Sequence, residues 1–218
     1  MHAIYFHGFA SGPKTAKGTA LGQQLASQLT SYSIPAIEGD DFTTLTMDRI
    51  MDRASAAVAA LPDDGEPLLV IGSSLGAYTA ATLAAQGRIP RADALLLIAP
   101  AFGFGERWAE KLGSAAVAEW RRTGQRKFFH HGSEKELPLG VGFLESAERL
   151  PGYPLAPEIP VVIVHGRRDE TVDWRESRRY ADQDANIELH LVDGDHRLTE
   201  PRHEELIAWC ARDLLKRI

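Results

Sequence analysis

The chain has 218 residues, of which 44% are hydrophobic and 25% are charged, and its formal net charge at pH 7 is -6. This composition is typical of a soluble globular protein, and the length suits one α/β domain with or without an inserted segment. The negative charge argues against an overall attraction to nucleic acid or to an anionic membrane surface. We therefore expect neither as the main partner.

Targeting signals are not evident in the sequence. The first residues have the pattern of a strand, without a basic start or a long apolar stretch before a cleavage site, so we expect no signal peptide. No apolar run is long enough to cross a bilayer. The single cysteine, Cys210, cannot form an internal disulfide, and we expect it to be a core residue of a helix. These features predict a cytoplasmic protein without membrane insertion.

Short apolar runs alternate with helical patterns along the chain, which is typical of a parallel sheet with helices on both faces. The predicted strands lie at residues 3–6, 33–37, 67–71, 94–98, 160–164 and 187–192. Most of them are apolar throughout, as expected for strands that are buried on both sides. The predicted helices lie at residues 15–29, 47–61, 75–86, 175–181 and 201–216. The fold class is therefore α/β, with a mostly parallel six-stranded sheet.

Residues 101–158 interrupt this alternation, because they lie between two predicted strands and are far longer than an ordinary crossover. We predict that they form a cap or lid inserted into a single domain of residues 1–218. Helical patterns at residues 106–122 and 143–150 flank a candidate hairpin at 127–132. The proline-containing segment 151–157 is expected to return to the sheet as a stiff connector.

The sequence Gly72-Ser73-Ser74-Leu75-Gly76 lies where an apolar run ends and an alanine-rich helical pattern begins. In a strand–turn–helix setting, the pattern Gly-x-Ser-x-Gly is a nucleophile elbow, a strained turn that holds a serine hydroxyl above the end of a sheet. The five-residue pattern alone is weak evidence, because it also occurs by chance. Its setting favours Ser74 as a catalytic nucleophile.

A serine nucleophile needs a base to take its proton, and the base works best when a carboxylate orients it. Two loops that follow predicted strands provide these groups in the order serine, acid, histidine. Asp169 follows the strand at 160–164, and His196 follows the strand at 187–192. We predict a triad of Ser74, His196 and Asp169. Two further carboxylates, Asp173 and Glu170, remain possible alternatives for the acid, and Asp195 could modulate the histidine.

An oxyanion formed on attack needs fixed hydrogen-bond donors. The backbone N–H of Leu75, which follows the nucleophile at the start of its helix, is one candidate. The second is the backbone N–H of Phe9, because His7-Gly8-Phe9 directly follows the first strand. Ser11 and Ser73 are weaker candidates for a role, the first as a turn residue and the second because it is out of register.

Metal chemistry is disfavoured, since the sequence has neither a His-Glu-x-x-His helix nor a cysteine cluster. We therefore expect no metal and no cofactor. Aromatic residues are concentrated in and near the inserted segment, and those above the strand ends are expected to line an apolar pocket. The basic residues Arg121, Arg122, Arg126 and Lys127 could meet an anionic group of a substrate, although a solvated helix face is the favoured interpretation.

The motifs around Phe9, Ser74, Asp169 and His196 together resemble the α/β-hydrolase superfamily. The opening sequence His7-Gly8-Phe9-Ala10-Ser11-Gly12-Pro13-Lys14 and the short chain are similar to its small bacterial YqiA-like esterases. The resemblance covers nearly the whole chain and implies that Ser74, Asp169 and His196 are the nucleophile, acid and base, and that Phe9 and Leu75 form the oxyanion hole. It also implies hydrolysis of carboxylic esters or thioesters without a cofactor.

The sequence thus predicts a serine esterase or thioesterase that acts on a small-molecule acyl substrate. The same triad could serve a peptidase, an acyltransferase or a C–C bond hydrolase, because a fold and a triad do not fix the substrate. A non-catalytic protein that binds small molecules in the same pocket is the remaining alternative. The sequence gives no indication of the oligomeric state.

Overall fold

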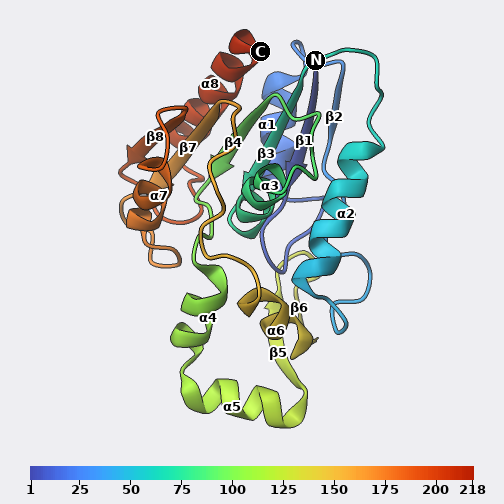
Figure 1. Cartoon of the computed structure of the whole chain (residues 1–218), viewed down its shortest axis with the longest axis vertical. Coiled ribbons are helices and arrows are strands. Elements are labelled where there is room, and N and C mark those ends of the chain that lie inside the picture. Colours follow the sequence, from blue (N-terminus) through green and yellow to red (C-terminus); the bar gives the residue numbers. More distant parts are fainter.

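A six-stranded sheet forms the centre of the computed structural model, which describes residues 1–218 (Figure 1). Its strands are β1 (His2–Phe6), β2 (Ser31–Ser33), β3 (Leu68–Ser73), β4 (Ala94–Ile98), β7 (Val161–Gly166) and β8 (Ile187–Val192). They lie in the order β2-β1-β3-β4-β7-β8, and every neighbouring pair is parallel. The predicted parallel sheet is confirmed, and the carboxyl ends of all these strands meet at one edge.

Helices cover both faces of the sheet. On one face α1 (Ala16–Leu25) packs beside α8 (Pro201–Arg217), and on the other α2 (Met47–Ala59) packs beside α3 (Leu75–Ala85) (Figure 1). A fifth helix outside the segment between β4 and β7, α7 (Trp174–Ala181), packs against β7 and β8. Apolar strands between two helical layers are buried on both sides, which explains why their sequences lack alternation.

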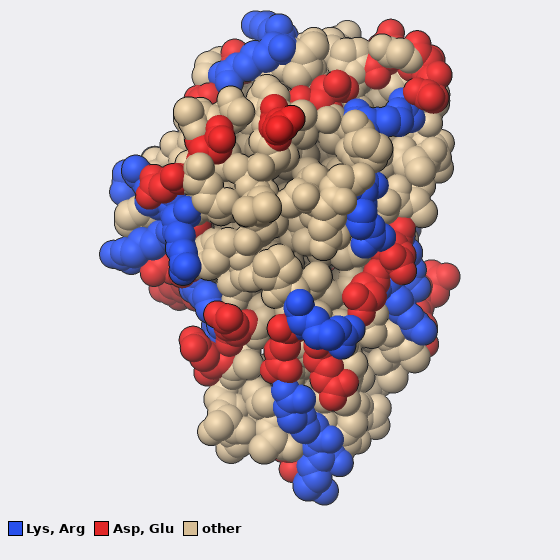
Figure 2. Space-filling view, in the orientation of Figure 1, with Lys and Arg blue, Asp and Glu red and all other residues tan.

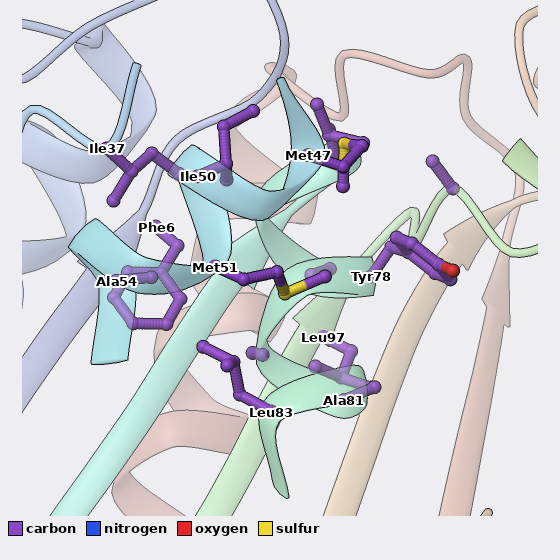
Figure 3. Close-up of a cluster of buried hydrophobic side chains, with 14 of the residues drawn as sticks. Phe6, Ile37, Met47, Ile50, Met51, Ala54, Tyr78, Ala81, Leu83 and Leu97 are labelled. Carbon is purple, nitrogen blue, oxygen red and sulfur yellow. The ribbon is translucent and has the colours of Figure 1, made fainter. Parts of the chain in front are cut away.

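Successive residues of β1 show how the sheet divides the core in two. Ile4 and Phe6 belong to the cluster that includes residues of α2 and α3, whereas Ala3 and Tyr5 belong to the cluster that includes residues of α8. This follows from the alternation of side chains along a strand. Figure 3 shows the first cluster, in which Phe6 lies close to side chains of α2 such as Ala54.

The segment between β4 and β7 contains five elements of its own, which hang from the carboxyl edge of the sheet (Figure 1). They are α4 (Phe104–Leu112), α5 (Ser114–Thr123), β5 (Gln125–His130), β6 (Lys135–Gly140) and α6 (Gly142–Glu148). The two strands pair antiparallel, so the predicted hairpin is present and is longer than expected. We refer to residues 101–158 as the insert.

Hydrogen bonds join the insert to the helices of the sheet. Ser146 Oγ in α6 accepts a hydrogen bond from the first backbone N–H of α2, at Met47, with a length of 2.8 Å. Tyr78 in α3 donates its hydroxyl hydrogen to the carbonyl oxygen of Pro151 at 2.6 Å. These bonds hold both the middle and the end of the insert against the main body.

Two predicted elements differ from the structure. The strand expected at residues 33–37 is wrong, since β2 covers only Ser31–Ser33, and Pro35 has no N–H with which to extend the ladder. The single helix expected at residues 106–122 is wrong as well. Gly113 interrupts it with a φ of 82°, a conformation that favours glycine.

The surface carries both signs of charge. On the face shown in Figure 2, acidic and basic side chains are interspersed, without one continuous region of a single sign. No helix combines the length and the apolar character that a membrane-spanning segment requires.

Candidate active site

Ser74 lies in the sharp turn between β3 and α3, at the carboxyl edge of the sheet. Its φ of 53° and ψ of -117° are rare for a residue with a side chain, and such a conformation costs about 1–3 kcal/mol. Hydrogen bonds hold the turn in place: the Ser74 N–H donates to Ile98 O at 2.8 Å, and the Ser74 carbonyl accepts from Ala101 N at 3.1 Å. The strained turn is therefore fixed by the neighbouring strand and by the start of the insert.

The glycines on either side of this turn are required by close packing. A Cβ atom on Gly72 would lie 2.5 Å from the Cα of Ala77, and one on Gly76 would overlap the carbonyl group of Phe6. Neither backbone neighbour can move without displacing a helix or a strand. The Gly-x-Ser-x-Gly pattern thus reflects the contacts of α3 with β3 and β1.

Of the three predicted triad residues, His196 lies within hydrogen-bond distance of both Ser74 and Asp169. His196 Nε2 is 3.1 Å from Ser74 Oγ, and His196 Nδ1 is 2.7 Å from Asp169 Oδ2. The histidine is in the loop after β8 and the aspartate in the loop after β7. Parallel strands bring both loops to the edge where the elbow lies, although the residues are far apart in sequence.

Asp169 is surrounded by hydrogen-bond donors. Its Oδ1 accepts from the backbone N–H groups of Thr171 and Val172, both at 2.8 Å. Burial raises the pKa of the carboxyl, but the hydrogen bonds from His165, His196 and Val172 and the charge of His196 outweigh burial and hold its pKa well below the usual value. Asp169 is therefore ionised at neutral pH and can orient an imidazole.

His165 at the end of β7 is a contact of Asp169 that the sequence reasoning missed. Its Nε2 lies 3.0 Å from Asp169 Oδ2 and 3.2 Å from Val172 O, and its Nδ1 lies 2.7 Å from Ser177 Oγ. Both partners of Nε2 are acceptors, so this nitrogen carries a hydrogen. The sequence feature that could have revealed this contact is the position of the histidine, four residues before the acid in the motif His165-Gly166-Arg167-Arg168-Asp169.

The loop after β1 lies against the elbow. A Cβ atom on Gly8 would be 3.4 Å from the Cβ of Ser74, so the two backbones are in close contact. The Phe9 N–H makes no hydrogen bond within the protein. Leu75 is the first residue of α3, where a backbone N–H has no acceptor within its own helix. Both predicted oxyanion donors thus lie close to Ser74 with N–H groups that the regular structure does not use.

The alternative polar residues have other contacts. Asp173 caps α7 by accepting from Arg175 N at 2.9 Å, and Asp195 accepts from the backbone N–H groups of Arg197 and Leu198, both at 3.0 Å. Neither carboxylate contacts His196, and neither does the exposed Glu170. Of the carboxylates considered from the sequence, only Asp169 meets the histidine.

A cavity of about 700 Å³ opens beside Ser74. Its apolar lining includes Phe9, Leu75, Phe102, Phe104, Trp108 and Val172, which come from the body and from the insert. The ring of Phe9 packs against the insert, with its centroid 5.4 Å from that of Trp108 and 5.2 Å from that of Phe143. The predicted apolar pocket at the strand ends is therefore present.

Basic side chains at this cavity are not those that the sequence suggested. Arg121 and Arg122 form ion pairs with Glu148 and Glu119, and neither they nor the other two suggested residues line the cavity. Four other cations do so: Arg107, Lys111, Arg167 and Arg175. No group of three or more histidine, cysteine, aspartate or glutamate side chains is arranged to bind a metal ion.

Solved structures define the class of this fold. The α/β-hydrolase domain-containing protein 10 from mouse matches with a TM-score of 0.82 at 22% identity, over 99% of this chain and 90% of that chain. Est1E from Butyrivibrio proteoclasticus with bound ferulic acid matches with a TM-score of 0.73 at 20% identity, over 99% and 88%. The parallel sheet with its flanking helices is an α/β-hydrolase fold, as predicted.

The family follows from the sequence comparison. The chain belongs to the uncharacterised protein family UPF0227, whose family model matches residues 2–208, so the predicted YqiA-like relationship is confirmed. The chain is also 27% identical over 158 residues to the mitochondrial palmitoyl-protein thioesterase ABHD10 of Mus musculus. That match covers 70% of this chain and 53% of the relative, so the chain spans about half the length of this curated protein.

Proposed function

We propose that the protein is a serine hydrolase that cleaves carboxylic esters or thioesters through an acyl-enzyme. The proposal is carried by one observation, the unbroken chain of contacts from Ser74 Oγ through both nitrogens of His196 to the buried carboxylate of Asp169. A neutral imidazole between a hydroxyl and a carboxylate acts as a general base. The distant esterase and thioesterase relatives support the same reaction class.

The first half of the reaction forms the acyl-enzyme. Ser74 Oγ attacks the acyl carbonyl carbon while His196 Nε2 takes the hydroxyl proton, and Asp169 balances the charge of the imidazolium. The carbonyl oxygen becomes an oxyanion, which accepts hydrogen bonds from the N–H groups of Leu75 and Phe9. The intermediate then collapses, and the alcohol or thiol leaves with the proton from His196.

Water completes the cycle. It attacks the acyl carbon while His196 takes one of its protons, and a second oxyanion forms in the same place. When this intermediate collapses, Ser74 recovers its proton from His196 and the carboxylic acid is released.

We infer further that residues 101–158 act as a cap within one domain of residues 1–218 and that the cap helps to choose the substrate. Phe102, Phe104 and Trp108 of the insert line the cavity beside Ser74, together with Leu75 and Val172 of the body. An apolar wall of this kind suits an acyl chain or an aromatic acyl group. The palmitoyl substrate class named for ABHD10 is one such group.

The test uses a fluorophosphonate probe, which reacts with activated serines. We expect labelling of the wild type and of Ser73→Ala, the adjacent serine, and no labelling of Ser74→Ala. A panel of aryl esters and acyl thioesters of graded chain length then defines the substrate. Hydrolysis retained by Ser74→Ala would rule out this assignment, and a wild type that resists the probe but gains thermal stability from a small ligand would point to a binding protein.

A further inference from the structure

The loop that carries Phe9 is held in an unusual conformation. The next residue, Ala10, has a φ of 53°, which is costly for a residue with a side chain and persists only where its surroundings impose it. Its N–H donates to Glu38 Oε1 at 2.7 Å. A side chain that is remote in sequence thus holds the backbone immediately after the predicted oxyanion donor.

Glu38 is buried to a degree that demands an explanation. Its side chain is 5% exposed, and the nearby cation, Arg53, donates to the backbone oxygen of Glu38 rather than to the carboxyl. Burial raises the pKa of Glu38 to about 8, while the N–H groups of Ala10 and Ser11 oppose that rise. Burying a carboxyl group without a lysine or arginine partner costs free energy. The presence of glutamate at position 38 therefore indicates that its carboxyl has a specific structural role.

The opposite side of Ala10 is held by the insert. The carbonyl oxygen of Ala10 accepts hydrogen bonds from the N–H groups of His131 and Gly132, at 2.7 and 3.4 Å, in the turn of the β5–β6 hairpin. Nε2 of the preceding residue, His130, lies 3.3 Å from Glu38 Oε2, without a hydrogen bond between the two atoms. His130 Nδ1 accepts from Ser133 N at 3.2 Å, which holds the ring in place beside the carboxyl of Glu38.

We propose that Glu38 and the β5–β6 hairpin together clamp Ala10 and so set the position of the Phe9 N–H in the oxyanion hole. Glu38 is a positioning residue, since it acts through Ala10 and does not touch the substrate. The proposal rests on the proposed hydrolase function for its kinetic consequence. Its structural content, the restraint of Ala10 by Glu38 and the hairpin, holds independently of that function.

The kinetic test compares Glu38→Ala with Glu38→Gln. Alanine removes the acceptor of the Ala10 N–H, and we expect kcat for an aryl ester to fall about 10- to 100-fold with KM within about twofold, because an oxyanion donor acts mainly in the transition state. Glutamine keeps an acceptor oxygen and should recover at least about a tenth of wild-type kcat. An equal loss of kcat in both variants, or a rise in KM as large as the fall in kcat, would indicate a general structural defect and overturn the proposal.

The hairpin side of the clamp has a matched pair of variants. His130→Ala removes the ring beside Glu38. We expect kcat to fall about 3- to 10-fold, because a shift of Glu38 would displace the Phe9 N–H from the oxyanion. His131→Ala is the control, because the His131 side chain packs on Phe129 and only its backbone N–H binds Ala10. Equal effects of the two substitutions would contradict a link through Glu38.

Amide hydrogen exchange tests the clamp without any substrate. In Glu38→Ala the exchange of the Ala10 amide should accelerate about 10-fold or more, while Glu38→Gln should stay close to the wild type. Unchanged exchange in the alanine variant would disprove the clamp even if the protein is an active esterase. Faster exchange in Glu38→Ala, together with a wild type that fails to react with a fluorophosphonate, would refute the hydrolase function and leave the clamp intact.

Discussion

The Nε2 atom of His165 lies 3.0 Å from Oδ2 of Asp169, and neither side chain has any exposed surface. The same carboxylate oxygen also faces Nδ1 of His196 at 2.7 Å. One carboxylate thus accepts from two imidazoles, a buried one that ends β7 and a partly exposed one in the loop after β8. The buried His165 therefore holds in place the Asp169 oxygen that accepts from His196.

Substitutions of His165 distinguish its hydrogen bond to Asp169 from its contribution to packing. His165→Leu leaves the Ser177 hydroxyl without its partner and removes one donor from Asp169, so we expect the free energy of unfolding to fall by about 2–3 kcal/mol. His165→Gln retains an N–H donor on a side chain of similar reach and should lose about half as much. Urea denaturation of both variants measures the difference, and equal losses would show that the donor is unimportant.

The identity of the acid is tested by amide substitutions. Asp169→Asn keeps the shape of the side chain but removes the charge that orients and balances His196, and we expect kcat to fall about 10³-fold or more. Glu170→Gln and Asp173→Asn are the matched controls, since neither side chain contacts His196 in the structure. If either control lost as much activity as Asp169→Asn, the assignment of the acid would be wrong.

Stability at low pH should depend on Asp169. Hydrogen bonds and the charge of His196 hold the pKa of its carboxyl below the usual value despite burial, which acts the other way. A carboxylate with a lowered folded-state pKa stabilises the fold above its unfolded-state pKa of about 3.9 and loses this contribution as the pH falls further. The advantage of the wild type over Asp169→Asn in unfolding free energy should be full above about pH 5 and shrink below about pH 4. A difference that stays constant down to strongly acidic pH would refute the lowered pKa.

The elbow glycines offer a steric test. A Cβ atom on Gly76 would overlap the Phe6 carbonyl, so Gly76→Ala must displace α3 or β1, and we expect a loss of about 3 kcal/mol or more together with the loss of fluorophosphonate labelling. Gly12→Ala is the control, because nothing lies within 4 Å of its Cβ position. Thermal unfolding of the two variants provides the comparison.

The single thiol should be inert in the folded protein. Cys210 is buried in α8, and burial raises its pKa to about 12, with Glu188 and Asp213 acting in the same direction. A thiol needs to ionise before it reacts with iodoacetamide. At pH 8 we expect alkylation only after unfolding in denaturant, as measured by mass spectrometry, and rapid alkylation of the native protein would contradict the burial.

The parallel sheet could be predicted because its strands are apolar throughout and alternate with helical patterns, which is a local property of the sequence. The antiparallel hairpin at β5 and β6 could be suspected from a few residues only. Two elements could not be predicted in detail. The break at Gly113 depends on one positive φ within an otherwise helical pattern, and the short β2 depends on where Pro35 ends the ladder.

Contacts across the fold explain which site residues the sequence revealed. Ser74, Asp169 and His196 occupy motif positions at strand ends, so their proximity follows from parallel topology. Glu38 and His130 carry no motif, and nothing in the sequence relates them to each other or to the loop at Ala10. Their meeting depends on how the hairpin folds back toward the first strand, which is a property of tertiary packing alone.

The backbone N–H of Gly103 donates to the carbonyl oxygen of Gly152 at 2.7 Å, so the chain enters and leaves the insert at a single point. A loop closed at its base in this way can be lengthened, shortened or exchanged without changing the register of the sheet. Chimaeras that replace residues 104–151 by a different closed loop would therefore exchange the wall of the substrate cavity, and the new loop would also have to replace the N–H groups of His131 and Gly132 that bind the Ala10 carbonyl. The grafted loop would have to supply an aromatic partner for Phe9, because that ring would otherwise face water.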